Sequence, residues 1–263
     1  MKVLFLTGSH PRHASVARAL NNAGLLSGLV IENRLEHIPA PPDDISDDLK
    51  ALFSMHFQKR ADSENKFFGK ADLPDTERLD VSREELNSDK VKAFIKHINP
   101  DVLLSYGVHI LSDEIIHSCK GESWNIHGGL SPWYRGCITH FWPSYFLEPQ
   151  MTGMTVHDLT QELDGGDVVH QNASELVKGD GIHDLACRAV LGISKEIPEL
   201  MNVLNNKGKL EKHKHKTTGR IWTSKDWRPD HLRPVYEFYN DKIVDLVLDG
   251  KIKRREPKLH RQF

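Results

Sequence analysis

The residues best suited to chemistry are an amide and an imidazole two positions apart, Asn125 and His127, followed by a carboxylate at Asp164. In an extended strand, residues two apart project from the same face, so Asn125 and His127 would point together. Asp164 begins the turn-prone sequence Asp-Gly-Gly-Asp at 164–167, which predicts a loop, where catalytic groups tend to lie. An amide, an imidazole and a carboxylate together suit the transfer of an acyl group to an amine.

Each of the three side chains has a chemical role in such a transfer. An attacking amine must lose a proton, and the former carbonyl oxygen gains negative charge. His127 can take the proton near neutral pH, and Asn125 can donate a hydrogen bond to the oxyanion, worth about 2 to 4 kcal/mol. Asp164 can hold the imidazole tautomer, stabilise the imidazolium or bind a water that relays protons. The alternative for Asp164 is a turn former beside two glycines, and a lone histidine among sixteen would mean little.

The elements that must position these residues follow an alternating order. Apolar runs and helical periodicities predict a strand, a helix, a strand, a helix and a strand at 2–7, 14–23, 29–31, 91–98 and 101–105. Such alternation favours an α/β fold, a Rossmann-like and mostly parallel sheet with helices on both faces. The polar segment 38–89 is interpreted as an excursion outside the core, with helices at 47–60 and near 83–86.

The second half of the chain predicts a strand pair and a long helix. Residues 154–157 and 168–171 flank the acidic turn, and 181–204 carries apolar residues at helical spacing. Lysines and histidines at 207–216 form a basic connector to a tail, in which 232–248 predicts one more helix. We therefore expect a catalytic domain at 1–205 and a small C-terminal extension at 206–263.

Composition narrows the class of protein. The chain has 263 residues, 38% hydrophobic side chains and a formal net charge of −2, so no strong overall field attracts nucleic acid or an anionic membrane. Three scattered cysteines form neither a disulfide framework nor a metal-ligand pair. The apolar start at 3–6 is too short for a signal peptide, and no run spans a membrane. We expect a cytoplasmic enzyme with a small-molecule partner, no metal, no nucleic acid and no membrane. The sequence leaves open whether it forms a homodimer.

The sequence resembles the 10-formyltetrahydrofolate-dependent formyltransferases. Asn125-Ile126-His127 with Leu130, Pro132 and the Tyr-Arg-Gly of 134–136 is similar to the family's Asn-x-His block, and 163–166 to its Asp loop. Residues 101–111 resemble the strand and turn that form one wall of its pterin pocket. The resemblance covers about residues 1–200 and implies 10-formyltetrahydrofolate as co-substrate and Asn125, His127 and Asp164 as catalytic residues. One departure is Gly128-Gly129, where many members carry Ser-Leu-Leu-Pro after the histidine.

The resemblance also implies binding residues. The folate would contact two segments, which contribute Tyr106, Gly107, Val108, Ile110 and Leu111 and then Gln161, Glu162, Leu163 and Gly165. Ser9, Arg12 and His13 follow the first strand, at the sheet edge where α/β proteins bind ligands, and are predicted to contact the substrate. Arg135 is open between binding substrate and anchoring a loop.

The acceptor is inferred by comparison within the family. About 55 residues follow the long helix, too few for the barrel domain of methionyl-tRNA formyltransferases, and 8–13 lack the phosphate loop of glycinamide ribonucleotide formyltransferases. A nucleotide-linked amino sugar, in surface polysaccharide or lipopolysaccharide biosynthesis, is the first choice. The alternatives are glycinamide ribonucleotide or another small amine, a formyltetrahydrofolate hydrolase-like relative, and an RNA-binding protein that uses the basic run 207–216, which would show steep salt dependence.

Overall fold

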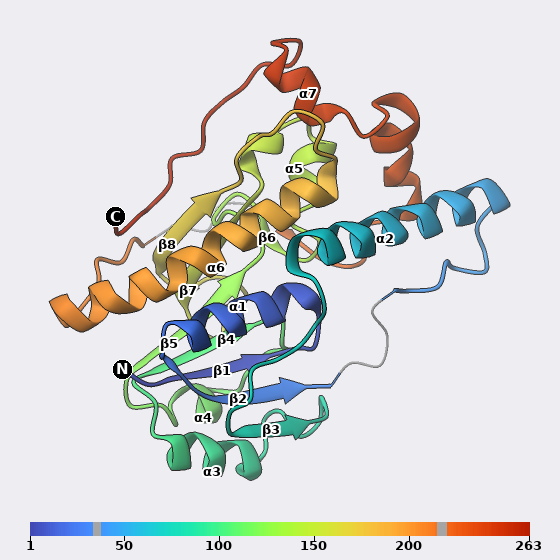
Figure 1. Ribbon diagram of the computed structural model, residues 1–263. Helices are drawn as coiled ribbons and strands as arrows, with labels where there is room; N and C mark the ends of the chain where they lie inside the picture. Colours follow the sequence, from blue (N-terminus) through green and yellow to red (C-terminus); the bar gives the residue numbers. More distant parts are fainter. Residues whose placement is uncertain (34–37, 215–219) are drawn as a thin grey trace.

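The core of the protein is one seven-stranded sheet, seen in the computed structural model, which describes residues 1–33, 38–214 and 220–263 (Figure 1). The strand order is β3-β2-β1-β4-β5-β7-β8. The first five strands are parallel, β7 is antiparallel to β5, and β8 is antiparallel to β7. Their bounds are Val3–Thr7 (β1), Leu26–Glu32 (β2), Arg78–Val81 (β3), Val102–Tyr106 (β4), Glu122–His127 (β5), Gly153–Asp158 (β7) and Val168–Ala173 (β8).

Helices cover both faces of this sheet, which confirms the predicted α/β class. One face carries α1 (Pro11–Asn22), α2 (Asp47–Phe68) and α6 (Ile182–Lys207), and the other carries α3 (Asp89–Ile98) and the short α4 (Asp113–Ile116). Strand β1 shows why: Val3 and Phe5 join the core under α1 and α6, whereas Leu4 and Leu6 join the core over α3. Side chains alternate along a strand, so a fully apolar strand needs cover on both sides.

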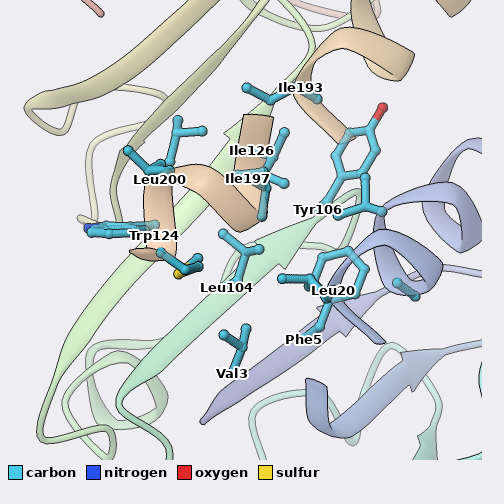
Figure 2. Close-up of a cluster of buried hydrophobic side chains, with 14 of the residues drawn as sticks. Val3, Phe5, Leu20, Leu104, Tyr106, Trp124, Ile126, Ile193, Ile197 and Leu200 are labelled. Carbon is cyan, nitrogen blue, oxygen red and sulfur yellow. The ribbon is translucent and has the colours of Figure 1, made fainter. Parts of the chain in front are cut away.

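The larger of the two cores is drawn in Figure 2. Ile193, Ile197 and Leu200 of α6 lie over Leu104 and Trp124 of the central strands, and Leu20 of α1 lies beside Phe5. The four-residue spacing from Ile193 to Ile197 keeps these side chains on one face of α6. This packing fixes the ends of β4 and β5, from which the site is built.

The interpretation of 38–89 as an excursion outside the core is wrong, because this segment contributes a long helix and a strand to the fold. Helix α2 runs through 22 residues and buries a stripe that includes Leu49, Phe53 and Phe68. After α2, β3 adds the outermost parallel strand, and residues 83–86 form turns instead of the predicted helix. The segment is therefore part of the fold.

The C-terminal part of the chain shares a core with α2. Leu232, Val235 and Tyr236 are buried in one cluster with Phe53 and Trp142, the latter in α5 (Trp142–Tyr145). The single helix predicted at 232–248 is wrong. A π-helical turn at Pro234–Phe238 and α7 (Ile243–Leu248) are separated by Asn240 and Asp241, both left-handed with φ of 51° and 56°. The division at 205 remains a prediction, although α6 ends at Lys207, close to it.

Strand β8 forms the second edge of the sheet, and this edge is covered. His213 exchanges backbone hydrogen bonds with Val168, and the amide of Gln171 donates to the carbonyl of His260. The Gln262 side chain donates to the carbonyl of Val169, 2.8 Å away. In Figure 1 the final segment of the chain returns from α7 toward β8.

Candidate active site

Strand β5 holds Asn125 and His127 on one face, as the two-residue period predicts. Asn125 is oriented by its neighbours: its Oδ1 accepts from Ser105 Oγ at 2.8 Å, and its Nδ2 lies 3.2 Å from His157 Nε2. His157 Nδ1 lies 2.8 Å from the carbonyl oxygen of Asp158, and its Nε2 also lies 3.5 Å from Asp164 Oδ1, so this ring links Asn125 to Asp164. The Asn125 nitrogen carries a second hydrogen that can polarise a substrate oxygen.

His127 lies at the end of β5, and its tautomer follows from its partners. Nε2 lies 2.8 Å from the carbonyl oxygen of Tyr134, which can only accept, so Nε2 bears the hydrogen. The basic nitrogen is then Nδ1, which faces Asp164 Oδ2 at 3.4 Å. Burial lowers the pKa of His127, while the Asp164 carboxylate opposes that shift. A proton taken by Nδ1 would form an ion pair with Asp164.

Asp164 reaches the histidine from a loop with a left-handed backbone, at φ 48°. Its Oδ2 accepts from the amide of Gly136 at 2.8 Å. A Cβ at Gly136 would meet the carbonyl oxygen of Trp222 at 2.0 Å, so only glycine fits this contact. Burial alone would raise the pKa of Asp164, but the imidazoles of His127 and His157 and the Gly136 amide outweigh it and hold the pKa well below its ordinary value. The carboxylate is therefore ionised beside the basic nitrogen.

Arg135 anchors the Asp164 loop through hydrogen bonds to residues 162–164. Its side chain is 1% exposed and donates from Nε to the carbonyl of Asp164 at 3.0 Å. Its Nη2 donates to the carbonyl of Leu163 and to Oε1 of Glu162. Of the two roles open from the sequence, this geometry supports loop anchoring, and substrate binding by Arg135 stays an untested prediction.

The two segments predicted to bind folate lie side by side. Gln161 Nε2 donates to the carbonyl of Leu111 at 3.3 Å and to Asp113 Oδ1 at 2.9 Å, which ties the loop after β4 to the Asp164 loop. Ile110 and Leu163 are exposed apolar side chains, one from each loop. Exposed apolar groups beside a reactive centre suit a flat, partly apolar ligand. That these residues bind folate stays a prediction.

A cavity of about 570 Å³ opens where the strand order reverses, between the ends of β1 and β4. Arg12 and His13 line it, as does Gly107, where a Cβ would lie 2.4 Å from His13 Nε2. Ser9 is not among the lining residues. Gly128 and Gly136 also line the cavity, so it adjoins the segment 128–141 that follows His127, the catalytic loop.

Sequence reasoning missed two residues that hold Asn125, namely Ser105 and His157. The register of β5 and β7 pairs Asn125 with His157, and β4 places Ser105 beside Asn125 on the other side. Strand alternation alone puts His157 on a face with Thr155, but it does not reveal which residue lies opposite.

An ionised carboxylate, a neutral imidazole and an oriented amide at the carboxyl edge of a parallel sheet are suited to acyl transfer. Among the residues described, no group of three or more His, Cys, Asp or Glu side chains is arranged to hold a metal ion. Within the described part of the chain, none of the helices has the length and apolar character needed to cross a bilayer.

Comparison with known proteins assigns the chain to a family. Residues 52–196, more than half of the chain and including all three catalytic candidates, match the family model described as formyl transferase. The chain therefore belongs to the formyl transferase family. It is 35% identical over 85 residues to the bifunctional polymyxin resistance protein ArnA of Wigglesworthia glossinidia brevipalpis, a segment that spans 32% of this chain and 13% of that protein.

Solved structures share the fold. Phosphoribosylglycinamide formyltransferase from Anaplasma phagocytophilum superposes with a TM-score of 0.56 at 16% identity, over 84% of this chain and 98% of that one. A sugar N-formyltransferase from Shewanella sp. gives a TM-score of 0.53 at 16% identity, over 86% and 78% of the two chains. At such identities the likeness concerns the fold, and the acceptor must be argued from the site.

Proposed function

We propose that the protein transfers the formyl group of 10-formyltetrahydrofolate to the amino group of a nucleotide-linked amino sugar. The observation that carries this proposal is the cavity beside the catalytic loop, which combines the guanidinium groups of Arg12 and Arg60 with an aromatic wall of Phe57, Phe141 and Trp227. Such a pairing suits a ligand that has both phosphates and a planar base. A formylated amino sugar would serve the assembly of surface polysaccharides.

The catalytic residues fit this chemistry at stated atoms. When bound, the folate supplies the formyl group. Asn125 Nδ2 donates to the oxygen that gains negative charge as the amine attacks, and removal of such a donor costs about 2 to 4 kcal/mol of transition-state stabilisation. His127 Nδ1 takes the proton of the amine, and Asp164, at 3.4 Å, stabilises the imidazolium. The same proton is then available for the folate nitrogen that leaves.

The formyl donor, 10-formyltetrahydrofolate, would bind at the loop after β4 and the Asp164 loop, which Gln161 connects. The Gln161 contacts to Leu111 and Asp113 hold the loops together, and none of these three residues lines the cavity, which leaves the cavity for the acceptor. Donor and acceptor would then meet at the end of β5. This arrangement supports a direct transfer between two bound substrates.

The proposal is tested by incubating the enzyme with 10-formyltetrahydrofolate and a panel of UDP-, dTDP- and GDP-linked amino sugars, with glycinamide ribonucleotide alongside. Tetrahydrofolate formation gives the rate, and mass spectrometry of the acceptor identifies the formylated product. We expect turnover with at least one amino-sugar nucleotide, and loss of most of it in His127→Asn. Faster formylation of glycinamide ribonucleotide, or folate turnover to formate without any acceptor product, would overturn the assignment.

A further inference from the structure

A row of buried polar residues crosses the sheet beside His127. The register pairs His127 of β5 with Thr155 of β7, and Thr155 in turn with Gln171 of β8. Residues that lie opposite each other in antiparallel strands project from the same face of the sheet. Thr155 is fully buried and Gln171 is 3% exposed. Because polar side chains at such depth need hydrogen-bond partners, those partners show what the row holds in place.

The partners of Thr155 and Gln171 lie near the start of the catalytic loop. Thr155 Oγ1 donates to the carbonyl of Gly129 at 2.7 Å and accepts from the amide of Ser131 at 3.0 Å. Gln171 Nε2 donates to the carbonyl of Ser131 at 2.7 Å and to Thr155 Oγ1 at 3.1 Å. These four bonds use the hydroxyl hydrogen, both lone pairs of that oxygen and both hydrogens of the amide. The backbone of 129–131 is therefore held from the side of β8.

The backbone that these bonds hold lies against the catalytic imidazole. A Cβ at Gly129 would lie 2.6 Å from His127 Nε2 and 2.4 Å from the carbonyl oxygen of Tyr134. The amide of Tyr134 also donates to the carbonyl of Leu130 at 2.9 Å. The Tyr134 carbonyl accepts the hydrogen of His127 Nε2. A displacement of 129–131 would therefore disturb the contact that fixes the tautomer of His127.

Gln171 is itself oriented by residues 260–263. The amide of His260 donates to Gln171 Oε1 at 3.2 Å, and the amide of Gln171 donates to the carbonyl of His260 at 2.8 Å. The same segment is tied to α6, because Arg261 Nη2 lies 2.9 Å from Glu196 Oε1. Since Oε1 of Gln171 accepts from His260, its Nε2 points to the catalytic loop.

We propose that Gln171 is a positioning residue for His127, and that residues 260–263 orient it from the edge of the sheet. The contacts run from His260 through Gln171 and Thr155 to the backbone that lies against the imidazole. The inference rests on the proposed function, in which His127 takes the proton of the amine. A positioning residue acts on the transition state through the base, so its loss lowers kcat and leaves KM nearly unchanged.

The contacts with the catalytic loop are tested by formyl transfer kinetics with the UDP-, dTDP- and GDP-linked amino sugars. Gln171→Met keeps the length of the side chain but makes none of the bonds, and it should lower kcat by about tenfold to a hundredfold, the scale of a small displacement of a reacting group. Thr155→Val should act in the same way, and Thr155→Ser, which keeps the hydroxyl, should recover most of the rate. Asn172→Leu is the matched control, since this neighbour on β8 donates to the carbonyl of Ala189 on α6, and its kcat should stay that of the parent.

The contact with residues 260–263 is tested by a pair of variants at His260. His260→Pro removes the amide hydrogen that Gln171 Oε1 accepts, whereas His260→Ala removes the ring and keeps the amide. We expect kcat to fall by about threefold or more in His260→Pro, the scale of one hydrogen bond, and to stay near that of the parent in His260→Ala.

Nitrogen NMR of the His127 ring gives a readout that does not depend on turnover. The signals, assigned by their loss in His127→Asn, should show the Nε2-protonated tautomer in the parent and a mixture of tautomers in Gln171→Met. Unchanged His127 signals in Gln171→Met, or a parent-like kcat in both Gln171→Met and Thr155→Val, would overturn the inference.

Two further outcomes separate this inference from the proposed function. If neither Gln171→Met nor Thr155→Val folds, an equal kcat in His260→Pro and His260→Ala overturns the inference. If the parent formylates none of the amino-sugar nucleotides while Gln171→Met changes the His127 tautomer, the proposed acceptor is rejected and the positioning role is supported.

Discussion

Buried histidines should make this enzyme lose stability in weak acid. Burial lowers the pKa of His56 to about 3 and that of His140 to about 4, and it also lowers the pKa of His183 well below its ordinary value. The rings of His56 and His183 are packed in a triangle with the Tyr236 hydroxyl, at 2.8 to 3.3 Å. Folding therefore requires these imidazoles to be neutral.

The sign and size of the effect follow from proton linkage. A histidine in the unfolded chain titrates at about pH 6.5, so below that pH the unfolded state binds more protons and is favoured. The stabilising contribution is complete above the unfolded pKa and is lost as pH falls toward the folded one. Between about pH 7.5 and 5.5, His56 and His140 each remove about 1.4 kcal/mol from the free energy of unfolding, or about 3 kcal/mol together. His183 adds to this loss, which is large against a total of about 5 to 15 kcal/mol.

Urea unfolding followed by tryptophan fluorescence at several pH values measures this directly. His140→Gln keeps a donor for the carbonyl of Gly153, 3.1 Å from Nε2, but cannot titrate, so the pH slope of stability should fall by about one proton. His97→Gln, at an exposed position, is the control for loss of an imidazole. Equal stability at both ends of the pH range, or a full slope in His140→Gln, would refute the reasoning.

Further predictions concern the catalytic residues. His127→Asn should abolish most turnover in the formyl transfer assay while folate binding, measured by calorimetry, stays near that of the parent. Asn125→Ala should lower kcat by about two to three orders of magnitude, and a pure rise in KM would instead indicate substrate positioning. Asp164→Asn should lower the rate and also move the acidic limb of the pH profile to lower pH, because the pKa of His127 falls without the neighbouring charge. Arg135→Ala should cost about 2 kcal/mol in urea unfolding, since it leaves the carbonyls of Leu163 and Asp164 without their donor, and unaltered stability would contradict its anchoring role.

The pairing of Asn125 and His127 on one face was predictable because it is local, whereas the family resemblance placed Asp164 beside them; that the three residues catalyse transfer stays a prediction. Asn125 and His127 lie on one face because side chains alternate along a strand, and the two glycines after Asp164 predict the loop in which it lies. The positions of His157 and of Glu64, a buried acid of α2, were not predictable, because the first depends on the register between β5 and β7 and the second on contact between α1 and α2 across 52 residues. Local periodicity in the sequence predicts neither the strand register nor the contact between the two helices.

The errors in element assignment have a related cause. Helix α2 buries only a narrow stripe of side chains, and most of its other residues are polar, so its composition resembles that of a surface excursion. Its Phe53 and Phe68 nevertheless belong to two different hydrophobic cores. At the other end, the apolar spacing of 232–248 fits a helix, but Asn240 and Asp241 take left-handed backbone. Asp241 Oδ1 then accepts from the amide of Ile182 at 3.0 Å and starts α6. A tertiary contact overrides local propensity there.

The covered edge of β8 bears on how copies of the protein can associate. An open edge strand is a template for pairing with any extended chain, and such pairing leads to aggregates and continuous sheets across subunits. Here Val168, Val169 and Gln171 already have partners from His213 and residues 260–262, so the protein completes its own sheet. Removal of residues 260–263 would take away the partners of Val169 and Gln171, while His213 still pairs with Val168, and would favour self-association through the exposed part of β8.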